Sequence, residues 1–329
     1  EDSLSKAIDP AWVGKYMCDG SVAWANVPAS WAGRLDGLAG EPLGSDICKD
    51  LPAKDLDARM ISYPWDLVRF NGEEIERDFA RLGGAAIEAD IPEGVHLVNQ
   101  EAIRLGRGVS LGPGVVIDAS LGPVLIDGGV EVMANASLAG PLSIGRASII
   151  KMGARIYGET TIGPVCKVGG EVGESIIHGY SNKQHGGFVG HSYLGEWVNI
   201  GAGTDTSDMK NNYSTVRLSV GGESVDSGGA FVGLFMGDHS KCGIGTTFNT
   251  GSIAGACCNI FGAGFPPKYI PSFSWGGSAG FSEHELEKAI ETARTAMARR
   301  DRKLDSAGEN ILREVFEITR EERLAFFGI

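Results

Sequence analysis

Residues 126–168 read IDGGVEVMANASLAGPLSIGRASIIKMGARIYGETTIGPVCKV, and an aliphatic residue occupies every sixth position of this stretch. These positions are Ile126, Val132, Leu138, Ile144, Ile150, Ile156, Ile162 and Val168. A period of six fits neither an amphipathic helix, with about 3.6 residues per turn, nor a strand that alternates every two residues. It is typical of hexapeptide repeats, in which a triangular parallel β-helix turns one apolar side chain per face into a continuous core.

The same period continues on both sides of this stretch. It runs earlier at Ile91, Leu97, Ile103, Val109, Val115 and Leu121, and it returns at Phe188, Leu194, Ile200, Met236, Cys242, Phe248, Ala254 and Ile260. We therefore expect the β-helix to span residues 86–265, with a polar loop insertion at residues 205–230. Glycine makes up 49 of the 329 residues, which suits a chain that turns a sharp corner every six residues.

The two flanks of the repeat region lack this period. Residues 1–85 are predicted to form a partial N-terminal unit. After the coil, Pro266 and Pro267 interrupt the repeat, and residues 266–329 are predicted to be a linker followed by helices. Because these helices carry apolar faces, we expect them to cap the open end of the coil. The fold class is therefore mainly β, a parallel β-helix with a C-terminal helical cap.

Composition excludes several classes of partner. The formal net charge is −13 at pH 7, whereas nucleic acid or an anionic membrane requires a basic face. The chain has no run of about 18 apolar residues, and no leader of the secretory type opens it. The six cysteines show no C-x-x-C spacing, which favours free thiols and a cytoplasmic protein.

A dense group of polar side chains interrupts the regular core pattern between residues 178 and 204. Three of the six histidines, His178, His185 and His191, lie here among Lys, Asn and Tyr residues. Asn182 stands at a hexad position that Ile, Leu or Val fills elsewhere. Patterns of this kind fail at functional sites, so we expect a site in this stretch.

Part of this stretch resembles a known family. Asn182-Lys183-Gln184-His185 leads into Asn199-Ile200-Gly201-Ala202-Gly203-Thr204 with the spacing seen in the bifunctional N-acetylglucosamine-1-phosphate uridyltransferases/glucosamine-1-phosphate acetyltransferases. The chain is also similar to a branch of sugar nucleotidyltransferases of this type through residues 61–68, 178–185, 236–242 and 270–277. This resemblance implies a left-handed coil and a homotrimer, and it makes residues 1–85 a remnant of a nucleotidyltransferase-like domain. The implied activity is CoA-dependent acetyl transfer from acetyl-CoA to a sugar phosphate or a nucleotide-linked amino sugar.

The candidate site residues follow from chemistry and from this resemblance. His185 is the predicted catalytic base, because acetyl transfer removes a proton from the attacking nucleophile and histidine titrates near neutral pH. The predicted substrate site consists of Lys183, chosen for its charge, with Asn182, Tyr193 and Asn199, whose role the resemblance implies. The resemblance likewise implies a cofactor site of Ala202, Gly203, His239 and Lys241. No residue is assigned to a metal.

Departures from the family leave other functions open. Residues 1–90 contain no Gly-rich basic run of the kind that cradles phosphate, and the family's Cys-Asn-Tyr-Asp-Gly loop is replaced by Asp205-Thr206-Ser207-Asp208-Met209. One alternative is a sugar-1-phosphate nucleotidyltransferase, using Mg²⁺, whose catalytic domain is largely missing from this chain. Another is a non-catalytic trimeric scaffold that binds a sugar nucleotide. A third is a zinc site of the γ-carbonic anhydrase kind, formed between subunits by His178, His185 and His191.

Overall fold

The computed structural model describes residues 7–31 and 45–328, so parts of the predicted N-terminal segment, and residue 329, lie outside the described residues. The chain divides into two units, Glu1–Tyr63 and Pro64–Ile329. In the first, β1 (Gly14–Cys18) pairs antiparallel with β2 (Ser21–Asn26) and parallel with β3 (Ala53–Asp55). Two short 3-10 helices, η1 (Ala29–Trp31) and η2 (Ser45–Cys48), accompany this sheet. The second unit begins earlier than the predicted coil boundary at residue 86, because it includes the helix that follows Tyr63.

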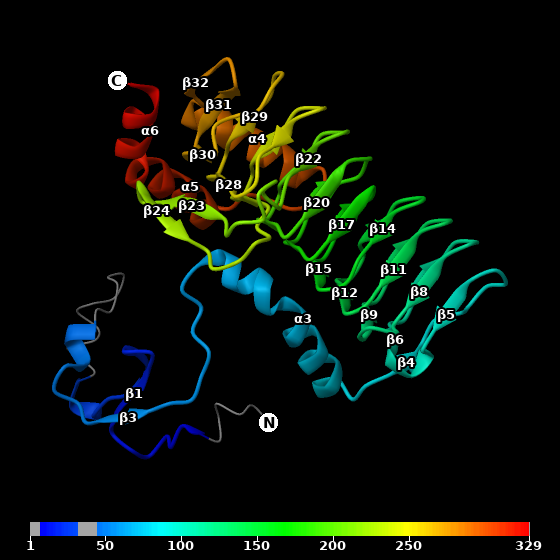
Figure 1. Ribbon diagram of the computed structural model, residues 1–329, viewed down its shortest axis with the longest axis horizontal. Coiled ribbons are helices and arrows are strands. Elements are labelled where there is room, and N and C mark those ends of the chain that lie inside the picture. The colour runs from blue at the N-terminus through cyan, green and yellow to red at the C-terminus, as the bar shows by residue number, and fades with distance from the viewer. Residues whose placement is uncertain (1–6, 32–44, 329) are drawn as a thin grey trace. The chain divides into compact units, whose positions relative to one another are not determined.

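Three parallel sheets form the faces of a coil in the second unit (Figure 1). Sheet I consists of β4 (Ala86–Ile87), β6 (Ile103–Leu105), β9 (Val124–Ile126), β12 (Leu142–Ile144), β15 (Thr160–Ile162), β18 (Ile176–Ile177), β21 (Tyr193–Leu194), β25 (Leu234–Met236), β28 (Ser252–Ala254) and β30 (Tyr269–Ile270). Sheet II consists of β5 (His96–Val98), β8 (Val116–Asp118), β11 (Ser137–Ala139), β14 (Arg155–Ile156), β17 (Glu171–Gly173) and β20 (Phe188–Gly190), and the pair β22 (Asp205–Thr206) and β27 (Thr247–Phe248) follows it.

Sheet III completes the triangle in two stretches that single bridges through Asn199 connect. The first stretch consists of β7 (Ser110–Leu111), β10 (Glu131–Val132), β13 (Ile149–Ile150), β16 (Lys167–Val168) and β19 (Asn182–Lys183). The second consists of β26 (Lys241–Cys242), β29 (Asn259–Ile260), β31 (Ser274–Gly277) and the antiparallel β32 (Gly280–Glu283). The predicted fold class, mainly β with a parallel β-helix built from hexapeptide repeats and with C-terminal helices, is confirmed.

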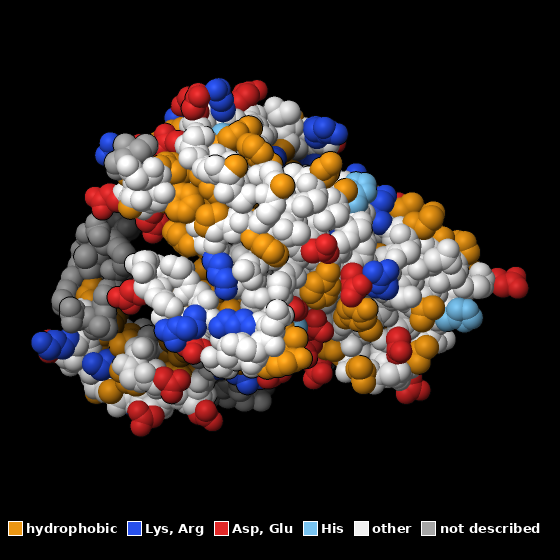
Figure 2. All heavy atoms as spheres, turned by 45° about the horizontal axis from the view of Figure 1, so that its top comes forward, with side chains coloured by type: hydrophobic (Ala, Val, Ile, Leu, Met, Phe, Trp, Pro, Cys, Tyr) orange, Lys and Arg blue, Asp and Glu red, His pale blue; other side chains and the backbone are white. Residues whose placement is uncertain are grey.

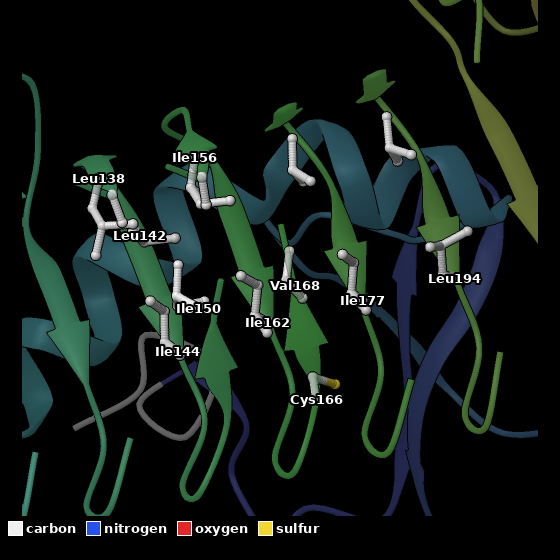
Figure 3. Packing of buried hydrophobic residues seen from close by; sticks show 14 of the residues in the cluster. Leu138, Leu142, Ile144, Ile150, Ile156, Ile162, Cys166, Val168, Ile177 and Leu194 are labelled. Atoms are coloured by element: carbon white, nitrogen blue, oxygen red, sulfur yellow. The ribbon is translucent and has the colours of Figure 1, made fainter. Parts of the chain in front are cut away.

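The hexad residues of the deciding stretch line the interior of the coil. All eight, from Ile126 to Val168, are at most 2% exposed. Figure 3 shows Leu138, Ile144, Ile150 and their neighbours projecting from successive strands into one continuous core. Each buried aliphatic side chain contributes roughly 1.5–3 kcal/mol, and stacking the coils makes that core continuous.

The predicted phase is wrong at three places, because the coils differ in length. Leu121 is 85% exposed, since the chain bulges outward before it rejoins sheet I at Val124. Thr161 pairs with Ile176 and Ile176 with Tyr193, so each of these two coils falls short of three whole hexads. The inward position therefore moves from Phe188 to Val189 and from Asn182 to Lys183, which pairs with Val168 and is 1% exposed.

Helices cover two parts of the coil. Helix α3 (Pro64–Arg81) lies along sheet I, where the side chain of Asn71 donates to the Glu159 carbonyl at 2.8 Å (Figure 1). A short helix, η3 (Gln100–Ala102), precedes β6. At the other end, α4 (Leu286–Ala298), α5 (Ser306–Ile318) and α6 (Arg320–Phe327) follow the last strands. Ile290 of α4 packs with Phe273 in a separate small core.

The polar insertion leaves the coil after β22 and returns at β25. Met209 and Phe231 form an antiparallel bridge at its base, and the hairpin of β23 (Arg217–Val220) and β24 (Glu223–Asp226) forms its body. Tyr193 of β21 pairs directly with Phe235 of β25, so sheet I continues across the insertion without a gap.

Candidate functional site

His191 stands at a corner of the coil, where the chain turns from β20 of sheet II into β21 of sheet I. Glu159 and Glu174 occupy the same corner in the two preceding coils, and all three residues adopt left-handed backbone, with φ of 53°, 43° and 45°. The amide of His191 donates to Gly173 at 3.3 Å, and the amide of Glu174 donates to Gly158 at 3.1 Å. The three corners therefore stack, and their side chains lie side by side outside the core.

Asp208 extends this stack by one coil, because it follows β22, which packs on β20. Its Oδ2 lies 2.8 Å from Nδ1 of His191, while Oε2 of Glu174 lies 4.0 Å from the same nitrogen. When Asp208 is ionised, the protonated Nδ1 donates a hydrogen bond to the carboxylate. The lone pair of Nε2 is then available. An imidazole oriented by a carboxylate in this way is suited to act as a general base.

A pocket of about 170 Å³ opens beside this pair. Trp65, Val68 and Arg69 of α3 form one wall, and Phe231 and Val232 at the end of the insertion form another. The ring of Phe231 stacks on the imidazole of His191, with centroids 5.0 Å apart and planes 20° apart. Burial raises the pKa of Glu174, which also lines the pocket, above its usual value. The pocket thus combines an apolar wall with the carboxylates of Glu159 and Glu174 and with the oriented imidazole of His191.

The structure places the predicted base, His185, on the surface and the predicted phosphate contact, Lys183, inside the coil. His185 lies on an exposed bend after β19, and its side chain makes no hydrogen bond with the described residues. Lys183 points into the coil, where its Nζ donates to the carbonyl of His185 at 2.7 Å. Burial lowers the pKa of Lys183 to about 8. Its side chain is 1% exposed, and its role as a phosphate contact stays a prediction.

Three other predicted residues meet at a second, larger pocket on sheet III. Asn182, Asn199 and Lys241 occupy successive positions of one outward column and line a pocket of about 510 Å³. The far wall comes from the C-terminal end of α4 and the residues after it, Arg299 and Arg300. Residues predicted to bind the substrate and the cofactor thus line one pocket. This pocket lies on a different face of the coil from the His191 corner.

The remaining predicted residues are held by the coil itself. Tyr193 lies in sheet I, with its ring stacked on Phe235 at 6.3 Å. Ala202 and Gly203 form a corner in which the Gly203 amide donates to Gly186 at 2.9 Å, with a φ of 68° that favours glycine. His239 is half-buried, its Nδ1 has no hydrogen-bond partner among the described residues, and burial lowers its pKa to about 4.

Within residues 7–31 and 45–328, no group of three or more His, Cys, Asp or Glu side chains could hold a metal ion. The six cysteines are buried free thiols. Among the described residues, no helix is long and apolar enough to cross a bilayer.

Comparison with known proteins gives matches among curated sequences, although no protein-family model matches the chain. The chain is 36% identical over 91 residues to the bifunctional sugar-1-phosphate nucleotidylyltransferase/acetyltransferase of Sulfurisphaera tokodaii, covering 28% of this chain and 23% of that protein. It is 31% identical over 186 residues to the bifunctional protein GlmU of Methylococcus capsulatus, covering 52% of this chain and 38% of that protein. Over its hexapeptide coils the chain is a distant homologue of GlmU.

The homology to GlmU covers only part of each relative. The chain spans about a quarter to two-fifths of the length of these two curated proteins. Among solved structures, the UDP-N-acetylglucosamine acyltransferase from Campylobacter jejuni aligns with 72% of this chain and 84% of its own, at 13% identity and a TM-score of 0.30. The chain is related, through GlmU, to the hexapeptide-repeat acyltransferases.

The sequence-based site omitted the His191–Asp208 pair and three of the four basic residues of the larger pocket, Lys167, Arg299 and Arg300. One signal for the pair was present, because Glu174, His191 and Asp208 are evenly spaced in the sequence, and their spacing equals the length of one short coil. Titratable residues that recur at the coil period stack at one corner. No such signal existed for Arg300, which lies 118 residues from the Asn182 side chain that it contacts.

Proposed function

We propose that this protein is an acyltransferase that transfers an acetyl group from acetyl-CoA to a sugar phosphate or a nucleotide-linked amino sugar, with His191 as the general base. The observation that carries the proposal is the 2.8 Å contact between His191 Nδ1 and Asp208 Oδ2 beside a pocket. The homology to GlmU supports the reaction class, since a bifunctional relative is named both for sugar-1-phosphate chemistry and for acetyl transfer.

The proposed step uses the imidazole as a proton carrier. As the acceptor amine attacks the thioester carbonyl, Nε2 of His191 takes one proton from the nitrogen. The new C–N bond forms, the C–S bond breaks when the tetrahedral intermediate collapses, and CoA leaves as a thiolate that recovers the proton from the imidazolium. Asp208 holds the ring in this orientation and stabilises the imidazolium while it carries the proton.

The proposal includes the setting of the reaction. By the family resemblance we expect a homotrimer, which light scattering would detect as three times the mass of one chain. We also place the protein in the cytoplasm, because its six free thiols suit a reducing compartment.

Release of CoA thiol from acetyl-CoA tests the proposal, with glucosamine-1-phosphate and nucleotide-linked amino sugars as acceptors. We expect His191→Asn to lower kcat by about 10²–10⁴-fold, the usual contribution of a general base. His185→Ala is the matched comparison, because that side chain is exposed and makes no hydrogen bond with the described residues.

The two variants also distinguish His191 from His185 as the general base. If His185→Ala abolishes turnover while His191→Asn retains it, the base is His185, and the corner pair has a structural role. If the unmodified protein neither turns over any acceptor nor binds CoA, acyl transfer is wrong and the scaffold alternative remains.

A further inference from the structure

The larger pocket gathers positive charge in an otherwise acidic chain. Lys167 and Lys241 project from sheet III, and Arg299 and Arg300 face them from the end of α4. The whole chain carries a formal charge of −13, and on the face shown in Figure 2 acidic side chains are spread among basic ones. Four cations around one pocket of about 510 Å³ are therefore a local departure from the character of the chain.

These cations are not neutralised by carboxylates of the described residues. None of the four forms a salt bridge there, although Arg300 donates to Asn182 Oδ1 at 2.8 Å and Lys241 donates to the His239 carbonyl at 2.9 Å. Lys167 makes no hydrogen bond within the described chain, and the Arg300 guanidinium, more than burial, lowers the pKa of Lys167 below its usual value. The pocket therefore holds unrelieved repulsion, which a bound anion would remove.

The aromatic residues beside the pocket have no free ring face for a base. Trp197 is stacked between Tyr180, with centroids 4.3 Å apart, and His239, with centroids 6.2 Å apart. The guanidinium of Arg302 lies 5.5 Å from the Tyr180 ring centroid. The amide side chains of Asn199 and Gln184 complete the polar lining. These features favour recognition of an anion by charge and hydrogen bonds over stacking of a nucleobase.

We infer that this pocket binds the diphosphate group of a small molecule, held by Lys167, Arg299, Arg300 and Lys241. Guanidinium groups match phosphate oxygens in a bidentate manner, and lysines add point charges. A diphosphate carries more charge than a sugar monophosphate, which suits four cations. CoA and nucleotide-linked sugars both contain a diphosphate, so either molecule fits the chemistry of this pocket.

Titration of the 329-residue protein with inorganic pyrophosphate, monitored by calorimetry at low ionic strength, tests this inference. We expect saturable binding that weakens as salt is added, because salt screens the attraction. Lys167→Ala should raise the Kd about tenfold and Lys167→Glu should raise it further, as expected for a charge-assisted contact. Because Lys167 makes no hydrogen bond with the described residues, neither variant is expected to affect folding.

Arg294→Ala is the control for loss of a cation outside the pocket, since Arg294 of α4 pairs with Glu309 and Glu291 instead of lining the pocket. It should bind pyrophosphate as the unmodified protein does. Absence of saturable binding, or an equal loss in Arg294→Ala and Lys167→Glu, would overturn the inference.

Competition then identifies the source of the diphosphate. Displacement of pyrophosphate by CoA assigns the pocket to the acyl donor, displacement by UDP-N-acetylglucosamine assigns it to the acceptor, and displacement by neither contradicts the inference. The inference is separable from the proposed function, because His191→Asn should lose turnover and keep pyrophosphate binding. Lys167→Glu should lose pyrophosphate binding whether or not the chain transfers acetyl groups.

Discussion

The ammonium group of Lys183 lies inside the β-helix, where it donates a 2.7 Å hydrogen bond to the carbonyl oxygen of His185. A position that holds an aliphatic residue in the neighbouring coils thus holds a lysine whose ammonium group is hydrogen-bonded to the backbone of the next bend. This bond fixes the start of the bend that leads to sheet II. The burial of the charge is costly, and its cost depends on pH.

We predict that Lys183→Met stabilises the protein at pH 7 by on the order of 1–3 kcal/mol, because it removes a buried charge and fills the same volume. The folded pKa of about 8 lies below the value of about 10.4 for an exposed lysine. The unfolded chain therefore binds more protons between these values, and wild-type stability rises with pH in that window. Denaturant unfolding from pH 7 to 10.5 should show the advantage of the variant shrinking above pH 8. A variant that is less stable at every pH would contradict this account.

Gly190 offers a way to displace Asp208 without removing it. A Cβ at Gly190 would overlap the ring of Phe188 and would lie 2.6 Å from Oδ2 of Asp208, so Gly190→Ala should shift that ring and push the carboxylate away from His191. We expect kcat for acetyl transfer to fall by up to about 100-fold, as for a misplaced catalytic group, with little change in Tm. Gly186→Ala is the control, because a Cβ there meets nothing within 4 Å. Equal activity of the two variants would argue against a role for the Asp208 contact.

His239 should make the protein sensitive to acid. Burial holds its folded pKa at about 4, below the ordinary value of about 6.5, so the unfolded chain binds the extra proton first as the pH falls. Its contribution to stability is complete above pH 6.5 and is lost progressively toward pH 4. His239→Phe keeps the stacking on Trp197 and removes the unpartnered Nδ1, so we expect a higher Tm and a weaker pH dependence between 4 and 6.5. The same slope in both proteins would show that another group is responsible.

The core of the coil allows a direct comparison of two isoleucines. Ile162 is 1% exposed within the continuous core, so Ile162→Ala should lower the free energy of unfolding by about 2–5 kcal/mol. Ile318 at the end of α5 is 76% exposed, and Ile318→Ala should change it by about 0.5 kcal/mol or less. Hydrogen exchange should place the loss in the coils next to β15. Similar losses for the two variants would mean that coil burial does not dominate stability.

Periodicity predicts the coil well wherever the coil length is constant. From Ile126 to Val168 each sixth residue faces inward, because every coil there consists of three whole hexads. Beyond that point, coils that fall short of three hexads shift the phase by amounts that composition does not reveal. Because of this shift, Lys183 takes the inward position that the sequence pattern had given to Asn182.

The candidate site was predictable only to the extent that it follows the coil. His191 and Asp208 lie one short coil apart in the sequence and meet because that coil stacks on the next. Trp65 of α3 and Arg300 after α4 reach their pockets through the packing of helices, and no spacing in the sequence specifies that packing. Local repetition therefore predicts the column of residues, whereas the opposite wall of each pocket requires the tertiary structure.

The direct pairing of Tyr193 with Phe235 has a consequence for how such a protein diversifies. The ladder needs only the two strand ends, so the segment between Met209 and Phe231 is exchangeable without disturbing the coils on either side. Because its ends bring Asp208 and Phe231 to the imidazole, a replacement segment would change the surroundings of the same histidine. The coil can therefore stay constant while the inserted segment varies.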